Sequence, residues 1–231
     1  MKAMILAAGR GERMRPLTDT TPKPLLVAGG KPLIVWHIER LAASGFRELV
    51  INHAHLGHVL EATLGDGSQF GVRIRWSPEP PGALETAGGI ANALALLGDT
   101  PFLVVNGDIW CDWDFRRALT PQKAPAHLVM IDNPAHHAGG DFLLQGDRLA
   151  LAGHSDGKAL TYAGIGIFSP AFFADLPRGA AMKLRPLLDT AIPKGLVSGE
   201  HHRGAWVDVG TPERLAELDR QLSSLHPEVA R

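Results

Sequence analysis

The feature that most constrains the fold is an alternation of short apolar runs with helical segments over the first half of the chain. In the first helical segment, Leu33, Trp36 and Leu41 recur at helical spacing, and Pro32 and Gly45 suit the beginning and end of a helix. Strands that alternate with helices form right-handed crossovers, so this order predicts an α/β sandwich whose mostly parallel sheet is covered on both faces. The expected strands are 2–7, 49–52, 72–76 and 102–106, and the expected helices are 32–43, 56–64 and 86–97.

The pattern changes after Asp114. Shorter strand-like runs and a hairpin turning at Gln145–Arg148 predict that the second half extends the sheet and supplies a lid over a second ligand. The expected strands are 127–131, 142–144, 149–151 and 162–168, with short strands near 197 and 207, and the expected helices are 184–192 and 212 to about 222.

Composition excludes several classes of partner. The 23 basic and 24 acidic residues give a formal net charge of −1, so no global field attracts nucleic acid or an anionic membrane. The single cysteine, Cys111, cannot form an internal disulfide, and no charged-then-apolar leader precedes the first strand. No apolar run reaches the roughly 18 residues of a membrane helix. We therefore expect a cytoplasmic protein that binds anions through local groups.

The segment Leu6–Thr18 has the composition of a phosphate-binding loop. Small residues and glycines directly after a strand let backbone N–H groups approach a polyphosphate, and Arg13 can add charge-assisted hydrogen bonds. A dinucleotide fingerprint requires a small residue where Met14 stands, and a P-loop requires Lys and Ser or Thr after Gly11, so neither motif fits. A solvated glycine-rich turn is the structural alternative.

Three charged residues outside this loop are further candidates. Lys23 stands between two prolines that restrict the backbone around it, and the alternative is an ordinary surface lysine. Asp108 follows the apolar strand 102–106, where ligands bind outside the carboxyl ends of parallel strands, and Asp208 ends a second strand-like run. Because Mg²⁺ prefers oxygen ligands and takes few of them from protein, this carboxylate pair suits a magnesium ion bound to phosphates. A turn or helix-capping role is the alternative for each.

Together the segments Leu6–Thr18, Pro22–Leu25, Asn106–Asp108 and Trp206–Gly210 resemble the sugar-1-phosphate nucleotidyltransferases, in that family's order and over nearly the whole chain. The resemblance implies a Rossmann-like three-layer sandwich with a mostly parallel mixed central sheet, and no C-terminal β-helix. It also implies an in-line displacement in which a sugar 1-phosphate attacks the α-phosphate of a nucleoside triphosphate and pyrophosphate leaves. No covalent enzyme intermediate is needed, so the protein contributes positioning and charge neutralisation.

The same resemblance implies one domain over residues 1–231, with a nucleotide-binding half at 1–112 and a sugar-binding half with the closing helix at 113–225. Arg13, Lys23 and Asp108 would be catalytic, with Arg13 facing the departing pyrophosphate. Asp141 and Gly164 would contact the sugar, and Asp108 and Asp208 would hold Mg²⁺. The expected nucleotide-binding residues are Ala8, Gly9, Gly11, Glu12, Arg13, Lys23, Glu79, Gly82, Gly88 and Asn106.

Substrate choice rests on two further segments. Glu79–Gly89 resembles the base-reading segment of the family, although a loop leading into a helix capped by Thr86 also explains it. Within the family, Leu84–Gly89 and Trp206–Thr211 are most similar to members that use UTP and N-acetylmuramic acid 1-phosphate in cell-wall recycling. Other pairs, dTTP with glucose 1-phosphate or GTP with mannose 1-phosphate, stay open. The family's Glu-Lys-Pro segment is absent, which leaves Lys158 or Lys183 to bind the sugar phosphate.

Two other classes of protein are alternatives to a nucleotidyltransferase. Zinc is suggested by the spacing His53-x-His55-x-x-His58 and by the pairs His136-His137 and His201-His202. This spacing matches no familiar zinc motif, and the lone cysteine offers no thiolate cluster. A non-catalytic regulator that binds nucleotide sugars would need the pocket but not the metal-binding carboxylates. The enzyme is favoured by the retained residues Arg13, Lys23, Asp108 and Asp208.

Overall fold

The structure is a computed structural model that describes residues 1–151 and 157–225. Within these residues a nine-stranded sheet has the order β5-β4-β1-β6-β11-β8-β12-β10-β9. The strands β5, β4, β1 and β6 are mutually parallel, β11 is antiparallel to both neighbours, and β12 is parallel to β8, so the sheet is mixed as predicted. Its strands are β1 (Ala3–Leu6), β4 (Glu48–His53), β5 (Arg73–Pro78), β6 (Phe102–Asn106), β8 (Ala126–Ile131), β9 (Phe142–Gln145), β10 (Arg148–Leu151), β11 (Ala159–Phe168) and β12 (Val197–His201).

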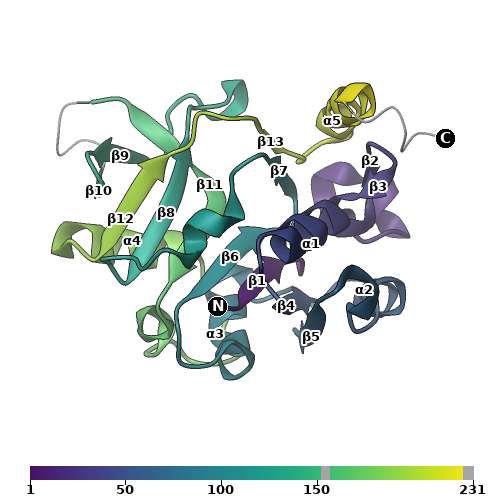
Figure 1. Cartoon of the computed structure of the whole chain (residues 1–231), viewed down its shortest axis with the longest axis horizontal. Helices are drawn as coiled ribbons and strands as arrows, with labels where there is room; N and C mark the ends of the chain where they lie inside the picture. The colour runs from purple at the N-terminus through teal and green to yellow at the C-terminus, as the bar shows by residue number, and fades with distance from the viewer. Residues whose placement is uncertain (152–156, 226–231) are drawn as a thin grey trace.

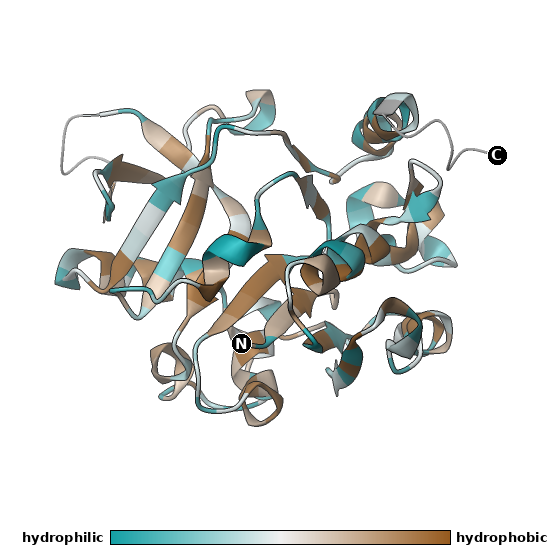
Figure 2. Cartoon of the chain, in the orientation of Figure 1, coloured by the Kyte–Doolittle hydropathy of each residue, from teal (hydrophilic) through white to brown (hydrophobic). Residues whose placement is uncertain are grey.

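Helices cover both faces of this sheet (Figure 1). In β1, Ala3 and Ile5 belong to one buried cluster and Met4 to the other, because successive side chains of a strand point to opposite faces. The first cluster packs under α1 (Leu33–Ala43) and α2 (Gly57–Leu64), and the second under α3 (Glu85–Leu97) and α4 (Leu184–Ala191). Figure 2 shows the resulting apolar colouring of the central strands. The predicted three-layer sandwich is confirmed.

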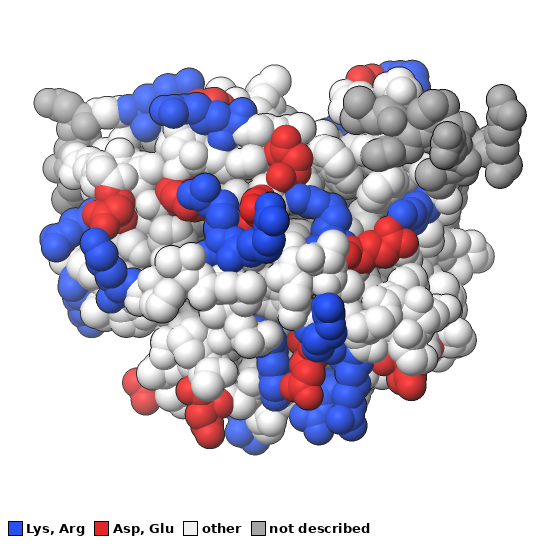
Figure 3. Space-filling model, viewed as in Figure 1, with Lys and Arg blue, Asp and Glu red and all other residues white. Residues whose placement is uncertain are grey.

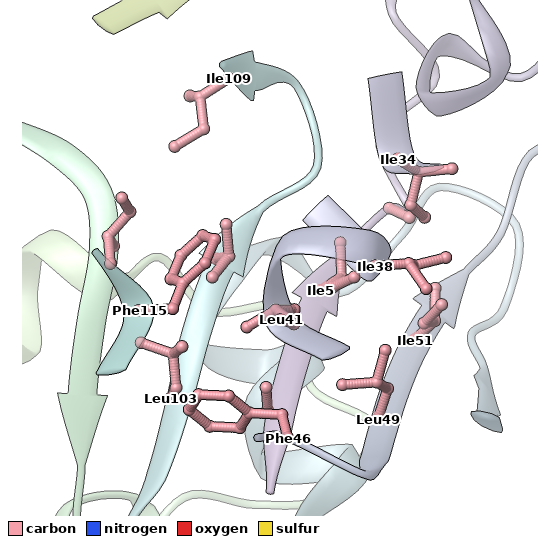
Figure 4. Close-up of a cluster of buried hydrophobic side chains, with 14 of the residues drawn as sticks. Ile5, Ile34, Ile38, Leu41, Phe46, Leu49, Ile51, Leu103, Ile109 and Phe115 are labelled. Carbon is pink, nitrogen blue, oxygen red and sulfur yellow. The ribbon is translucent and has the colours of Figure 1, made fainter. Parts of the chain in front are cut away.

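Helix α1 shows how the spacing of apolar residues produces this packing. Ile34, Ile38 and Leu41 recur at intervals of four and three residues, lie on one helix face and point toward Ile5 and Ile51 of the sheet (Figure 4). The helix ends as predicted, with Gly45 in the left-handed region at φ 94°.

One local prediction was wrong. Helix α3 begins at Glu85 with Leu84 as N-cap, so Thr86 lies inside the first turn and does not cap it. The first-turn amides of Ala87 and Gly88 instead donate to the carbonyl oxygen of Met182, at 2.9 and 3.1 Å. A partner nearly a hundred residues away in sequence thus replaces the local cap.

The long loop after β1 contains only short 3-10 turns as regular structure. Its turn at Glu12–Met14 buries Met14 in a third cluster with α5 (Pro212–Leu225). Small strands unforeseen from sequence are β2 (Val27–Ala28), which pairs with β3 (Lys31–Pro32), and β7 (Ile109–Cys111), which pairs with the expected β13 (Trp206–Asp208). The 3-10 helices are 12–14, 17–19, 23–25, 68–70, 115–119, 135–137, 170–173 and 192–194.

The helices and the charges of one face of the molecule bear on the partners that the composition excluded. Among the described residues, no helix is both long and apolar enough to cross a bilayer. On the face drawn in Figure 3, basic and acidic side chains lie close to one another. Among the ion pairs of the described residues, Arg117 lies 2.5 Å from Glu200.

Candidate active site

A cavity of about 340 Å³ opens where β1, β4 and β6 end. The register pairs Leu6 of β1 with Asn52 on one side and with Asn106 on the other, so the polar side chains that follow these apolar strands reach the same edge. This is the expected place for a ligand in a parallel sheet. The lining residues are Leu6, Ala7, Ala8, Gly9, Arg10, Lys23, Pro24, Asn52, Glu79, Gly82, Ala83, Glu85, Thr86, Asn106 and Asp108.

One wall of this first cavity depends on Asn52, which is 2% exposed. Its Oδ1 accepts from the backbone N–H of Ala7 at 2.9 Å, and its Nδ2 donates to Glu79 Oε1 at 2.6 Å. Glu79 Oε2 in turn accepts from the backbone N–H of Leu84 at 2.7 Å. The glycine-rich loop and the segment before α3 are therefore held together by one continuous chain of hydrogen bonds.

The base of the first cavity carries an ion pair. Lys23 is buried, with a side chain 9% exposed, and its Nζ lies 2.5 Å from Asp108 Oδ2. Lys23 begins a 3-10 turn, 23–25, which follows Pro22 and contains Pro24, and its burial excludes the alternative of an ordinary surface lysine. A buried lysine on a half-exposed carboxylate gives the site one cation that is not freely solvated.

A second cavity, of about 320 Å³, shares Asn106 and Asp108 with the first. A ligand in one cavity therefore meets a ligand in the other at these two residues. The second cavity is lined by Asn106, Asp108, Ile109, Pro134, His136, His137, Thr161, Tyr162, Ala163, Gly164, Trp206 and Asp208.

The two candidate metal ligands are brought together by β7 and β13. Asp208 pairs with Ile109 in this ladder, and the N–H of Val209 donates to the carbonyl oxygen of Asp108 at 2.9 Å. Two carboxylates that are a hundred residues apart in sequence thus border the same cavity. The donor set fits Mg²⁺, which takes oxygen ligands and keeps several waters. Within residues 1–151 and 157–225, no cluster of three or more His, Cys, Asp or Glu suits a metal, which gives the zinc hypothesis no support.

The predicted residues of the glycine-rich loop separate into two groups. Ala8 and Gly9 line the first cavity, whereas Gly11, Glu12 and Arg13 do not. Gly11 adopts φ 70° and packs on Lys23, since a Cβ there would lie 3.2 Å from that side chain's Cβ. Glu12 pairs with Arg10 at 2.6 Å, and Arg10, which was not predicted, lines the cavity.

The segment expected to read the base also has some predicted residues at the first cavity and one that packs against other backbone. Glu79 and Gly82 line the first cavity, but Gly88 packs against the backbone of residues 180–182, and its role in base reading stays a prediction. Gly89 packs directly against the hydrogen bond between Asn52 and Glu79, because a Cβ there would lie 2.6 Å from Glu79 Oε1 and 2.9 Å from Asn52 Nδ2. A glycine at position 89 is needed to leave room for this hydrogen bond.

In the second half, Gly164 lines the second cavity, whereas Asp141 is not among the lining residues but contacts two of them. The ladder between β11 and β8 shifts register between Tyr162 and Gly166, and Gly164 adopts φ 75° in this bulge beside Asn106. Asp141 Oδ2 accepts from the N–H of Tyr162 at 2.9 Å, and its Oδ1 lies 3.2 Å from His137 Nε2. Asp141 thus positions two residues that line the cavity.

Neither lysine suggested for the sugar phosphate lies at the site. Lys158 and Lys183 are exposed and line neither cavity. The basic residues that do line the second cavity are His136 and His137, which sequence reasoning considered only as zinc ligands. The adjacent pair was visible in the sequence, but its loop had no predicted contact with β13.

A buried histidine of α1 forms a hydrogen bond to the backbone of β7. His37 of α1 lies 2.7 Å through Nε2 from the carbonyl oxygen of Ile109, which makes this nitrogen the donor. Burial lowers the pKa of His37 to about 4, an effect that the hydrogen bond to Ile109 partly offsets. The imidazole is therefore neutral at neutral pH and acts as a support for the strand that follows Asp108.

Comparison with known proteins agrees with this geometry. Residues 2–138 match the family model described as nucleotidyl transferase. The chain is 55% identical, over 94% of its length and 96% of the relative's, to N-acetylmuramate alpha-1-phosphate uridylyltransferase of Neisseria meningitidis serogroup B. It is 35% identical to the protein of the same name in Caulobacter vibrioides, over 96% of both chains.

A more distant relative and a solved structure extend the comparison. Mannose-1-phosphate guanyltransferase of Aspergillus fumigatus is 31% identical over 92% of this chain and 62% of its own. A crystal structure of a putative glucose-1-phosphate thymidylyltransferase from Bacillus anthracis superposes with a TM-score of 0.83 at 22% identity, covering 96% of this chain and 95% of that one. At this identity the structural match establishes the α/β fold with its mixed sheet.

Proposed function

Because the chain belongs to the nucleotidyl transferase family, we propose that it transfers a uridylyl group from UTP to N-acetylmuramate α-1-phosphate, giving a UDP-sugar and pyrophosphate. The observation that carries the reaction type is the pair of cavities that meet at Asn106 and Asp108. The choice of UTP and of this sugar is supported by the 55% identity over nearly the full length of both chains.

The first cavity suits the nucleotide. The backbone at Ala8 and Gly9 would approach the phosphates, and Arg13, on the same loop, would face the β- and γ-phosphates. Glu79 and Gly82 would border the base, on the wall that Asn52 holds in place. The second cavity would hold the sugar phosphate, with Gly164 and the residues positioned by Asp141 around the sugar.

The junction of the cavities is where the two phosphates would meet. Lys23, the buried cation at this point, would neutralise charge as the sugar phosphate oxygen attacks the α-phosphate in line with the leaving pyrophosphate. Asp108 and Asp208 would hold Mg²⁺, which when bound offsets negative charge on the phosphate oxygens. No group of the protein needs to form a covalent bond, so positioning supplies most of the effect.

We also propose that the protein works in the cytoplasm on small molecules alone. The single thiol, Cys111, is buried and its pKa is raised by burial, which suits a protein without disulfides. The near-neutral net charge offers no general attraction for nucleic acid.

The test is pyrophosphate release with Mg²⁺, using UTP, dTTP, CTP, GTP and ATP each against N-acetylmuramic acid, N-acetylglucosamine, glucose and mannose 1-phosphates. We expect release with UTP and the muramic acid derivative. Release only with GTP and mannose 1-phosphate, or with dTTP and glucose 1-phosphate, would overturn the substrate and keep the mechanism. If UTP binds but no pair releases pyrophosphate, the enzyme assignment fails in favour of a nucleotide-binding regulator.

A further inference from the structure

Two arginines from opposite ends of the chain meet at Gly210, between β13 and α5. Arg214 Nη1 lies 2.7 Å from Asp208 Oδ2 and 3.0 Å from His136 Nε2. Nη2 of Arg214 and Nη2 of Arg13 both approach the position that a Cβ on Gly210 would occupy, Arg13 Nη2 to within 3.1 Å. Glycine at this position lets both guanidinium groups lie as they do, and a side chain here would displace their ends.

The charges around Gly210 do not balance. Two guanidinium groups, which stay protonated, face one carboxylate, Asp208. Within the described part of the chain, Arg13 has no acidic side chain within 4.0 Å, and the only carboxylate so close to Arg214 is Asp208. Bringing two like charges together is unfavourable unless an anion compensates them. Forked N–H donors from two arginines beside one glycine make a suitable site for an anion with several oxygens.

We propose that Arg214 is a second arginine of the polyphosphate site and binds, together with Arg13, the pyrophosphate end of the nucleotide. In the structure Arg214 pairs with Asp208, the only carboxylate within 4.0 Å of it among the described residues. A metal ion held by Asp208 would compete with Arg214 for this carboxylate and would leave the guanidinium donors for phosphate oxygens. This proposal rests on the proposed function in that the nucleotide's leaving group is the anion.

The position of Arg214 favours pyrophosphate over the sugar phosphate. Its Nη1 contacts Asp208 and His136, which line the second cavity, whereas its Nη2 lies with Nη2 of Arg13 at Gly210, and Arg13 belongs to the glycine-rich loop. An anion that contacts both arginines therefore lies on the side of the loop.

The experiment compares Arg214→Gln with Arg220→Gln. Arg220 lies on the same helix, is exposed and pairs with Glu217, away from both cavities. We would measure Mn²⁺ binding to the free protein by calorimetry, and then pyrophosphate binding at saturating metal. Arg214→Gln should tighten metal binding, because Arg214 no longer competes for Asp208. It should weaken pyrophosphate binding about tenfold or more, the loss expected for a hydrogen bond between charged groups. Arg220→Gln should change neither.

Opposite shifts in the two affinities are the signature, since general damage to the fold would weaken both. If Arg214→Gln weakens both affinities, leaves pyrophosphate binding unchanged, or raises the KM for the sugar phosphate instead, the proposal is overturned. Should Arg214→Gln not fold, Arg214→Lys keeps the charge but not the fork; it should lose several-fold in pyrophosphate affinity, and wild-type affinity would contradict the proposal. Because both readouts are binding, they can succeed even if UTP and N-acetylmuramic acid 1-phosphate prove to be the wrong substrates.

Discussion

Changing Asn52 to aspartate tests the chain of hydrogen bonds that joins the glycine-rich loop to the segment before α3. The substitution preserves the shape of the side chain and the acceptor for the N–H of Ala7, which lies at 2.9 Å. It replaces the amide donor, 2.6 Å from Glu79 Oε1, by a carboxylate oxygen. Two carboxylates then face each other, and the one at residue 52 is buried, because Asn52 is 2% exposed.

The magnitude follows from two limits. At an effective dielectric constant of about 20, two carboxylates about 3 Å apart repel each other by about 5 to 6 kcal/mol. Taking up one proton relieves this, and at pH 7 protonation costs about 4 kcal/mol, or about 1.4 kcal/mol for each pH unit above an ordinary carboxyl pKa of about 4. The protonation route sets the upper limit, so we expect a loss of stability of about 4 kcal/mol at pH 7 and about 1.4 kcal/mol at pH 5.

The assay is urea unfolding of both proteins at pH 7 and pH 5, taking the difference between variant and wild type at each pH so that other titrating groups cancel. Asn92→Asp is the matched control, because Asn92 donates at 3.4 Å to Ser77 and Pro78 and faces no carboxylate among these partners. Its effect should be small and nearly independent of pH. A deficit of Asn52→Asp that is equal at both pH values would refute the carboxylate contact, and the absence of any deficit would refute the role of Asn52.

Three further predictions concern the supports and the centre of the site. Lowering the pH from 7 to 4 should reduce the free energy of unfolding of the wild type by about 3 kcal/mol more than that of His37→Gln. The reason is that the imidazole takes up its proton below about pH 6.5 in the unfolded chain but only near pH 4 when it is buried. Equal losses of stability in urea unfolding would contradict this. Asp108→Asn should lower kcat at least about 100-fold while leaving the melting temperature near the wild-type value, and a variant with full activity would remove Asp108 from the centre. Gly88→Ala should destabilise by about 1 to 3 kcal/mol, since the new methyl group meets the backbone at Ala180, whereas Gly139→Ala, which meets nothing within 4 Å, should not; similar melting temperatures would contradict the packing.

The sequence by itself determined the layer order and the main edge of the site. The spacing of Leu33, Trp36 and Leu41 and the apolar runs ending at Asn52 and Asn106 depend only on local periodicity, and they predicted the helix α1 and the parallel strands correctly. Which of these side chains face the sheet was not predicted, because Leu33 and Trp36 pack in the third cluster instead. The predicted mixed sheet and the family follow from the same local signals, read together with the order of the motifs.

Only the tertiary structure decided how distant residues meet. Whether Asp108 and Asp208 border one cavity depends on the pairing of β7 with β13, and β7 is too short to have a periodic signal. The first turn of α3 is satisfied by Met182 and not by Thr86, because a backbone acceptor from another part of the chain replaced the local cap.

The contacts of Asn52 and Arg214 were likewise invisible in the sequence. An asparagine at the end of a strand looks the same whether it faces water or Glu79, and an arginine on an amphipathic helix looks the same whether it faces water or Asp208. Local periodicity determines which face of an element is apolar, whereas the partner of a polar side chain depends on which elements pack together. For this reason the fold could be predicted from the sequence, while the internal contacts of the site required the structure.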